Sequence, residues 1–308
     1  MSPRVVALGG GHGLAATLNS LRTLTSEITA VVTVADNGGS SGRLRQEFNQ
    51  LPPGDLRMAL AALCADDEWG RGWAQVLQHR FTSSGEMNGH AVGNLLLTAL
   101  WDIDQNLVAG LDRVGELLKV VGRVLPMAIE PLDIAGTFRT KYGIQDVRGQ
   151  VEVATTQGEL QALHLIPEKP QATPEVLDAI ADAEWITIGP GSWFSSVMPH
   201  ILLSAQADAI SKSAGKKILI FNLPENSNDG EFAGNSPEEH LQLVRNHLPN
   251  LHLDYAIADP TVITPTSTLE NLVQSCGGEL IVADIAQEVN PHHHDPEKLT
   301  SVFAHIFR

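Results

Sequence analysis

The residues best suited to hold an anion lie in a glycine-rich segment near position 40. Gly38 and Gly39 let the backbone turn closely and present N–H groups to a ligand, and Ser40 and Ser41 add hydroxyl donors. Guanidinium groups that suit phosphate follow at Arg43, Arg45 and Arg57. An apolar run precedes the glycines, so we expect a strand that ends in a ligand-binding loop.

Two carboxylates accompany this segment. Asp36 comes directly before Asn37 at the end of the apolar run, and Asp55 follows the rigid turn Pro52-Pro53-Gly54. We expect Asp55 to cap the helix that begins near Leu56, which is a structural role. If the protein is an enzyme, Asp36 and Asp55 are the candidate catalytic residues, because carboxylates bind a metal ion or activate an acceptor.

A second glycine turn lies near the N-terminus. Residues 4–8 read as a buried strand, and the residues after it read as a tight turn into a helix, whose free N–H groups would stabilise a phosphate. The turn consists of Gly9, Gly10, Gly11, His12, Gly13 and Leu14. Gly9 and Gly11 match the first two glycines of the dinucleotide fingerprint, but Leu14 takes the place of the third. Two such loops after neighbouring strands predict one shared crevice.

Three further segments carry polar groups at the ends of predicted elements. The strand 185–188 leads to Gly189, Pro190, Gly191 and Ser192, and simple helix capping explains Ser192 equally well. Asn222 ends another strand and leads to the polar run 226–231, which would fit a mobile lid or a turn. Asn94 begins an apolar helix after the loop 82–89, a second candidate lid. Trp193 is the tryptophan that we expect near the ligand.

The elements that must position these groups alternate between strands and helices. This alternation predicts an α/β fold, a Rossmann-like, doubly wound and mainly parallel sheet covered on both faces. We expect helices at 14–22, 56–65, 91–101, 108–118, 174–183, 237–247 and 296–307, and further strands at 28–34, 217–221, 253–258 and 279–283. Between 123 and 166, short β-like runs separated by glycines predict a small antiparallel excursion from a single domain that spans 1–308.

Composition limits the classes of function. The 308 residues are 43% hydrophobic and can bury a large core. A formal net charge of -16 argues against nucleic-acid or anionic-lipid partners, because the mean field repels polyanions. Cys64 and Cys276 are the only cysteines, so we expect a reducing compartment and assign neither a catalytic role. Without an evident leader or an apolar run of about 18 residues, we expect no membrane insertion and a cytoplasmic location.

The histidine run His292-His293-His294 resembles a metal cluster, but Pro291 and Pro296 flank it and adjacent histidines do not share one helical face. We therefore interpret the run as a solvated turn in which Asp295 caps the following helix.

Taken in order, these motifs resemble the gluconeogenesis factors, also called YvcK-like proteins, which are related to the phospholactate transferase (CofD) of coenzyme F420 synthesis. The resemblance covers nearly the whole chain and rests on the segments 9–14, 31–45, 52–57, 93–96 and 189–196 with Pro199, Asn222 and Leu223. It implies a Rossmann-like core and a nucleotide-type ligand, reported for the family as a UDP-sugar. It also implies self-association and a cytoplasmic role in carbon-dependent cell shape and envelope synthesis.

Four departures from the family pattern bear on the ligand. His12 replaces the more usual threonine, and His200 stands where an asparagine often follows the proline; both could touch ligand. Asn37 replaces the second carboxylate of an Asp-Asp pair, so that Asp36 would hold magnesium only in a largely hydrated shell. The Gly-Glu-Thr motif of the family does not follow Asn222, which leaves the sugar open.

The first functional hypothesis is a ligand-sensing regulator that requires no cofactor. A UDP-sugar binds across the glycine loops, and protein partners in envelope synthesis read the changed surface. Asp36 would accept hydrogen bonds from a ribose or sugar hydroxyl, and Gly10 to Gly13 would line the diphosphate. Arg43 and Arg57 would pair with phosphate.

Two other hypotheses remain open. A magnesium-dependent transferase of the phospholactate type would use Asp36 and Asp55 to bind metal or activate an acceptor. An NAD-binding protein is a weaker alternative, in which Asp36 takes the ribose, and opportunistic NAD binding fits a site shaped for a UDP-sugar.

Overall fold

The computed structural model describes residues 2–104, 106–224, 236–264 and 267–308, and within them a seven-stranded sheet runs in the order β10-β9-β8-β7-β1-β2-β3. Every neighbouring pair in this sheet is parallel, which confirms the predicted doubly wound fold. The strands are β1 (Val5–Gly9), β2 (Ile28–Val32), β3 (Arg123–Pro126), β7 (Trp185–Ile188), β8 (Lys216–Ile220), β9 (Tyr255–Ala258) and β10 (Glu279–Val282).

The strand order places a topological switch point between β1 and β7. From β1 the chain builds β2 and β3 on one side, then returns to β7 on the other side of β1. Val5 pairs with Ile28 of β2 and with Trp185 of β7, so the three strands end at nearly the same level. The first three glycine loops therefore leave one edge of the sheet, where doubly wound folds bind ligands.

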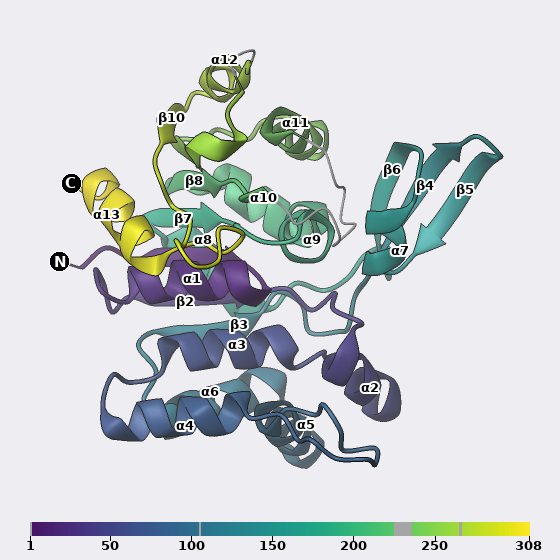
Figure 1. Ribbon diagram of the computed structural model, residues 1–308, viewed down its shortest axis with the longest axis vertical. Helices are drawn as coiled ribbons and strands as arrows, with labels where there is room; N and C mark the ends of the chain where they lie inside the picture. Colours follow the sequence, from purple (N-terminus) through teal and green to yellow (C-terminus); the bar gives the residue numbers. More distant parts are fainter. Residues whose placement is uncertain (1, 105, 225–235, 265–266) are drawn as a thin grey trace.

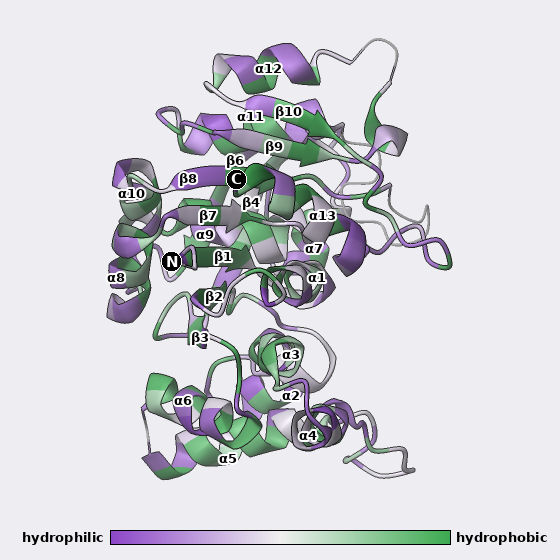
Figure 2. Cartoon of the chain, turned by 90° about the vertical axis from the view of Figure 1, so that its left-hand side faces the viewer, coloured by the Kyte–Doolittle hydropathy of each residue, from purple (hydrophilic) through white to green (hydrophobic). Residues whose placement is uncertain are grey.

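Helices cover both faces of the sheet (Figures 1 and 2). α1 (Gly11–Leu21) and α13 (Pro296–Ile306) lie on one face, and α8 (Pro174–Asp182) and α10 (Ser204–Lys212) lie on the other. All five residues of β1 are buried, as expected for a strand that is covered on both sides.

A group of helices extends the molecule beyond β3 (Figure 1). Its members are α2 (Gly39–Phe48), α3 (Gly54–Leu63), α4 (Glu68–Gln78), α5 (Val92–Asp104) and α6 (Leu107–Leu118). The sequence did not predict α2 or α4. Much of the expected loop near position 40 is in fact the helix α2, because its glycines and serines obscure the helical pattern and Leu44 is its only buried apolar side chain.

An antiparallel arm projects from the sheet beside the ligand loops (Figure 1). It contains β4 (Asp133–Thr140), β5 (Gly143–Arg148) and β6 (Glu159–Ile166) in the order β5-β4-β6, with α7 (Gln150–Thr155) between β5 and β6. The predicted excursion therefore begins at Asp133 and not at Arg123. Residues 123–126 form β3 because they pair with β2 at the edge of the parallel sheet.

The remaining elements follow β7 and β8. They are a π-helical turn (Trp193–Val197), α9 (Met198–Leu202), α11 (Pro237–His247), a 3-10 turn (Pro260–Val262) and α12 (Leu269–Ser275). Most predicted elements match the observed ones to within a few residues. In the described part of the chain, no helix combines the length and the apolar character that crossing a bilayer requires. The polar run 226–231 lies outside the described residues.

The core holds both cysteines and three of the tryptophans. They are Cys64, Cys276, Trp101, Trp185 and Trp193. Trp69, by contrast, is 48% exposed and contacts Trp73 on the surface of α4.

Candidate ligand-binding site

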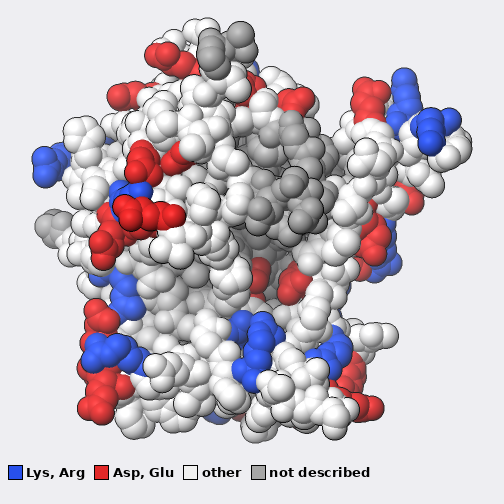
Figure 3. All heavy atoms as spheres, in the orientation of Figure 1, with Lys and Arg blue, Asp and Glu red and all other residues white. Residues whose placement is uncertain are grey.

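A cavity of about 420 Å³ opens at the carboxyl ends of β1, β7 and β8. Five of the predicted site residues line it, namely His12, Gly13, Gly191, Ser192 and Asn222. The sequence reasoning did not place the rest of the lining at a ligand, and that part includes Asn19, Pro224, Gln287, Asn290, His292, His293 and His294. Figure 3 shows a hollow on the same side of the molecule, with acidic side chains inside it and basic side chains directly below.

Two glycines of the first turn allow the loops to meet. A methyl group on Gly13 would lie 2.3 Å from the carbonyl oxygen of Pro190, so α1 and the third loop touch backbone to backbone. A methyl group on Gly10 would lie 2.5 Å from both Asp55 Oδ2 and Thr33 Cγ2. Larger residues at these two positions would push the loops apart. Leu14, the last residue of the turn, is buried in the core instead.

Asn222 fixes the third loop from the end of β8. Its Nδ2 donates to the carbonyl of Gly191, and its Oδ1 accepts from the amide of Gly191, both over 2.9 Å. The side chain therefore holds the rim of the cavity in place through both of its polar ends. Gly189 and Pro190 belong to the same loop, and Ser192 caps the turn after it by accepting from the amide of Ser195.

Trp193 lies away from the cavity. Its indole is buried and stacks on the ring of His240 with 4.3 Å between centroids. The expectation that Trp193 faces the ligand is therefore wrong for this structure, because the π-helical turn directs the indole toward α11.

His200 is likewise fully buried below the first glycine turn. Its Nδ1 lies 2.7 Å from Gln206 Nε2, and its Nε2 lies 3.4 Å from the carbonyl oxygen of Gly9. Burial lowers the pKa of His200 to about 4, so the ring is neutral at pH 7. His200 supports the turn from within the core and does not line the cavity.

The two candidate carboxylates lie close together beside the first turn. Asp36 Oδ1 accepts from the amide of Gly38 at 2.9 Å and from Nε2 of Gln150, in α7 of the arm, at 3.0 Å. Asp55 is in the first turn of α3 and its carboxylate accepts from the amide of Gly11. Burial, and then the charge of Asp36, raise the pKa of Asp55 to about 7.

Asp55 does not cap α3, contrary to the expectation. The cap position belongs to Pro53, and no side chain caps the helix there. The turn instead places the Asp55 carboxylate against the backbone of the first glycine loop, which is a long-range contact that helix-capping rules do not anticipate.

A chain of buried hydrogen bonds orients Arg57. Arg57 Nε donates to Asn94 Oδ1 at 2.8 Å, Asn94 Nδ2 donates to Ser40 Oγ at 3.0 Å, and Ser40 Oγ lies 3.0 Å from His90 Nδ1. Burial, and then the charge of Arg80, lower the pKa of Arg57 to about 10. Three of the predicted residues are thus joined by direct contacts, although their elements are α2, α3 and α5.

The other predicted site residues between Asn37 and Arg45, together with Gly54, lie on α2, next to it or beside the arm. A methyl group on Gly149 would lie 3.3 Å from Asn37 Nδ2, and one on Gly54 would lie 2.3 Å from Ser41 Oγ. Gly39 has a φ of +50°, which favours glycine, at the start of α2. Arg45 forms an ion pair with Asp133 of the arm at 2.6 Å.

Arg43 contacts the loop after α4. Its Nη1 and Nη2 donate to the carbonyls of Glu86 and Asn88, each over 2.7 Å. The amide of Gly89 also donates to the carbonyl of Phe81 at 2.8 Å. Arg43 therefore holds the candidate lid 82–89 in this structure, and the proposal that it pairs with phosphate requires it to exchange these partners.

The histidine turn (His292 to His294) and the start of α1 both line the cavity and meet there. The ring of His293 lies 5.4 Å from the ring of His12, between centroids. His292 Nδ1 is 2.6 Å from the carbonyl oxygen of Pro224, and the buried His294 contacts the carbonyl oxygen of Phe221 at 3.1 Å. The run is therefore not a freely solvated turn. Within the described residues, no group of three His, Cys, Asp or Glu side chains could hold a metal ion.

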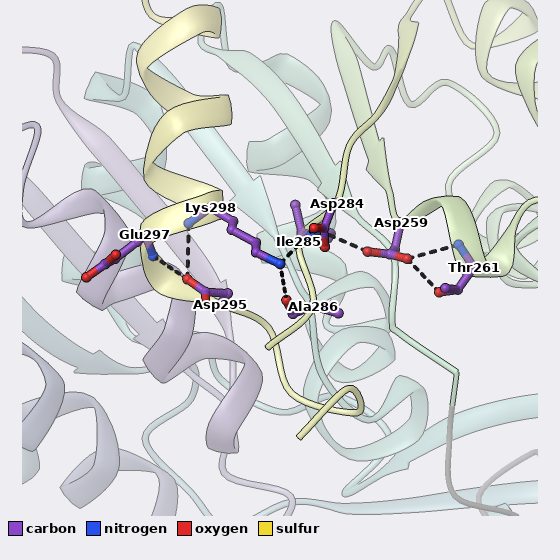
Figure 4. A network of polar contacts seen from close by, with 8 residues as sticks. All are labelled: Asp259, Thr261, Asp284, Ile285, Ala286, Asp295, Glu297 and Lys298. Carbon is purple, nitrogen blue, oxygen red and sulfur yellow. Dashed lines mark hydrogen bonds and ion pairs between the residues drawn. The ribbon is translucent and has the colours of Figure 1, made fainter. Parts of the chain in front are cut away.

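A polar network fixes both ends of this turn (Figure 4). Lys298 Nζ donates to Asp284 Oδ2 at 2.7 Å and to the carbonyl of Ala286 at 2.8 Å, and Asp259 accepts from the amide of Ile285 at 3.0 Å. Asp295 caps α13 by accepting from the amides of Glu297 and Lys298, which confirms the predicted cap. The turn is therefore held in place on the wall of the cavity.

A sequence profile of the family described as 2-phospho-L-lactate transferase CofD matches residues 5–303. The matched region contains the glycine loops, both carboxylates and the histidine turn. The chain belongs to the CofD family.

Relatives within this branch of the CofD family carry a common name. A Mycobacterium tuberculosis protein with the provisional name gluconeogenesis factor is 45% identical over 309 residues, which cover 98% of this chain and 90% of that protein. A gluconeogenesis factor of Listeria monocytogenes is 32% identical over 85% of this chain and 79% of its own length.

A crystal structure of a Bacillus halodurans protein described as a member of the upf0052 family has the same fold as this CofD family member. The TM-score is 0.86 at 31% identity, with 99% of each chain covered. The resemblance inferred from the motifs is thereby confirmed.

Proposed function

We propose that this CofD family member binds a nucleotide sugar, a UDP-sugar, in the cavity and acts as a regulator that links gluconeogenic growth to cell shape and envelope synthesis. The single observation that supports this most strongly is the cavity itself, where Gly13 of α1, the loop at Gly191 and the end of β8 at Asn222 meet at the switch point of the sheet. Backbone amides and neutral polar side chains in such a place suit the hydroxyl and phosphate groups of a nucleotide sugar.

The regulatory role rests on the names of the relatives and on the position of the arm. Gln150 of α7 contacts Asp36, and Asp133 of β4 contacts Arg45, so the arm is joined to the ligand loops at two points. Closure of the loops on a ligand would move the arm, and protein partners or a second copy of the chain would read that movement.

Isothermal titration of the full chain with UDP-N-acetylglucosamine tests this proposal. NAD and GDP are titrated in parallel, each with and without magnesium. Saturable binding of the UDP-sugar without metal is the expected result, and NAD serves as the probe of opportunistic dinucleotide binding. The proposal fails if the UDP-sugar produces no saturable heat while GDP binds.

A second candidate function is a magnesium-dependent transferase of the phospholactate type. The observation that favours it is the pair of carboxylates, Asp36 and Asp55, since a cation between them would relieve the repulsion that raises the pKa of Asp55. Mg²⁺ keeps several waters and is commonly held by one or two carboxylates together with phosphate, so these two residues fit a hydrated ion. Product formed from guanylyl-activated phospholactate and a deazaflavin acceptor, only with magnesium, would favour this function over the regulator.

A further inference from the structure

The strongest unexplained feature outside the cavity is the guanidinium group of Arg57. Arg57 is 2% exposed, and among the described residues no group hydrogen-bonds to its buried Nη1. The Nε atom is held by Asn94, so the orientation of the guanidinium group is fixed. A buried cationic donor without a partner is costly, because the desolvation of its N–H group is not compensated.

A second guanidinium group lies nearby, and the two repel each other. Arg80 stands between α4 and the loop 82–89, where its Nη1 donates to the carbonyl of Gly89 at 2.9 Å. The charge of Arg80 is the second cause, after burial, that lowers the pKa of Arg57. The same two guanidinium groups, together with His293 and burial, lower the pKa of His12. Three basic groups thus act on one another at the N-terminus of α1.

The carboxylates do not neutralise this cluster fully. Asp55 faces Arg57, but its pKa is raised to about 7 by burial and by Asp36, so a substantial fraction of Asp55 is protonated near neutral pH. Asp36 is engaged by the amide of Gly38 and by Gln150. The α1 N-terminus adds the partial positive charge of an 11-residue helix, and Gly10 caps it without a side chain. The two guanidinium groups and the N-terminus of α1 therefore lie beside a carboxylate, Asp55, that is only partly ionised near neutral pH.

We propose that Arg57, Arg80 and His12 form a phosphate subsite at the N-terminus of α1. Arg57 Nη1 is the fixed donor, and Arg80, which is exposed, is the mobile donor that exchanges the carbonyl of Gly89 for a phosphate oxygen. His12 lines the cavity and so joins the subsite to it. The phosphate comes either free from solution or as part of a nucleotide, and in the nucleotide case the inference rests on the proposed function.

The test uses the full chain and four probes, which are inorganic phosphate, uridine, UDP and UDP-N-acetylglucosamine, titrated at constant ionic strength. The variants are Arg80→Gln and Arg57→Lys, and the second keeps a cation in the core if loss of Arg57 impairs folding. Arg71→Gln is the matched control, because Arg71 also lies on α4 but contacts Asp66 on the surface. Circular dichroism establishes that each variant is folded.

We expect Arg80→Gln to weaken UDP or inorganic phosphate binding at least tenfold while uridine binding, where measurable, and the Arg71→Gln variant stay unchanged. Loss confined to UDP assigns the subsite to the nucleotide, and loss that includes inorganic phosphate assigns it to a free anion as well. The inference is overturned if neither inorganic phosphate nor UDP binds the wild type, or if every one of these two probes that binds the wild type binds Arg80→Gln and Arg57→Lys as tightly.

The same titrations separate this inference from the proposed function. If UDP-N-acetylglucosamine and UDP each bind the wild type and Arg80→Gln equally well, the proposed function stands and the phosphate subsite is refuted. Arg80-dependent binding of inorganic phosphate without any binding of the UDP-sugar leaves the subsite standing and removes the proposed function.

Discussion

The imidazole of His12, in the first turn of α1, faces the imidazole of His293 at a centroid distance of 5.4 Å. The two residues come from opposite ends of the chain, and α13, which follows His293, packs on the same face of the sheet as α1 (Figure 1). Both residues line the cavity, together with the glycine loop at Gly191. Loosening the histidine turn should therefore affect the ligand before it affects the fold.

The cap of α13 allows a direct test of this relationship. Asp295→Ala removes a side chain that accepts from two amides, and we expect a loss of stability of about 0.5–2 kcal/mol together with weaker UDP-sugar binding. Asp67→Ala removes a similar cap from α4, where Asp67 accepts from Gly70 at 2.7 Å, well away from the cavity lining. Thermal unfolding and calorimetry should show a similar stability loss for both variants and a binding loss for Asp295→Ala alone. Equal binding by both variants would contradict a role for the turn.

The close approach of α1 to the third loop predicts an asymmetry between two glycines. Gly13→Ala places a methyl group against the carbonyl oxygen of Pro190, and we expect a loss of about 1–3 kcal/mol and weaker ligand binding. Gly72→Ala, on the exposed side of α4, meets no atom within 4 Å and should gain about 0.5–1 kcal/mol from helix propensity. Denaturant unfolding of both variants measures the difference, and a gain of stability in Gly13→Ala as well as in Gly72→Ala would show that α1 and the loop can separate freely.

The buried carboxyl of Asp55 predicts a stability that falls as the pH rises. Its pKa is raised from 3.8 to about 7, so as the pH rises the carboxyl ionises in the unfolded chain before it ionises in the folded protein. The free energy of unfolding is therefore highest at low pH and decreases between about pH 4 and pH 7. Asp55→Asn should therefore be more stable than the wild type at pH 8, by up to about 4 kcal/mol at roughly 1.4 kcal/mol per pKa unit, and similar to it at pH 4.

Thermal unfolding from pH 4 to pH 8 measures this difference, with Asp66→Asn as the control because the Asp66 carboxylate is 90% exposed. Burial lowers the pKa values of His200 and His294 to about 4, so these two residues reduce the free energy of unfolding as the pH falls below about 6.5, which is the opposite direction. Both histidines are present in the wild type and in Asp55→Asn, so their effect cancels when the free energies of unfolding of the two proteins are subtracted. A difference that does not change with pH would place the pKa of Asp55 near its ordinary value.

The contacts of Arg43 predict an effect on the loop 82–89. Arg43→Ala removes two hydrogen bonds to loop carbonyls, so amide exchange at residues 81–90 should accelerate, with a stability loss of about 1 kcal/mol. Hydrogen exchange with mass spectrometry measures the loop, and Arg71→Ala serves as a surface control. A binding loss of about 1.5–3 kcal/mol without faster loop exchange would instead make Arg43 a phosphate ligand.

The sequence predicted the sheet well because buried parallel strands leave a simple local signal. The apolar runs that became β1, β7 and β8 could be recognised without knowing their neighbours, and the glycines after them marked the ligand edge. The helix α2 was missed because Gly39, Ser40 and Ser41 give a loop-like signal, and only contacts with the rest of the fold stabilise the helix there.

The histidine turn shows where sequence reasoning ended. His292, His293 and His294 were noticed, but their flanking prolines pointed to a solvent-exposed turn. Their place in the cavity depends on α13 packing beside α1, on Lys298 holding Asp284 and Ala286, and on Asp259 holding Ile285. Arg80 carried no signal at all, because its relation to Arg57 depends on the packing of α4 and α5 against α3.

The sequence by itself determined the parallel sheet, the edge at which the glycine loops gather and the membership of the family, because strand pattern and loop composition are local properties of the chain. The tertiary structure decided which polar groups share one environment. It buried His200 and Trp193, joined Asp36 to the arm, brought His293 to His12 and gave Arg57 Nη1 no partner among the described residues. The reason is that contacts between distant segments, and the loss of solvent around them, arise only when the chain has folded.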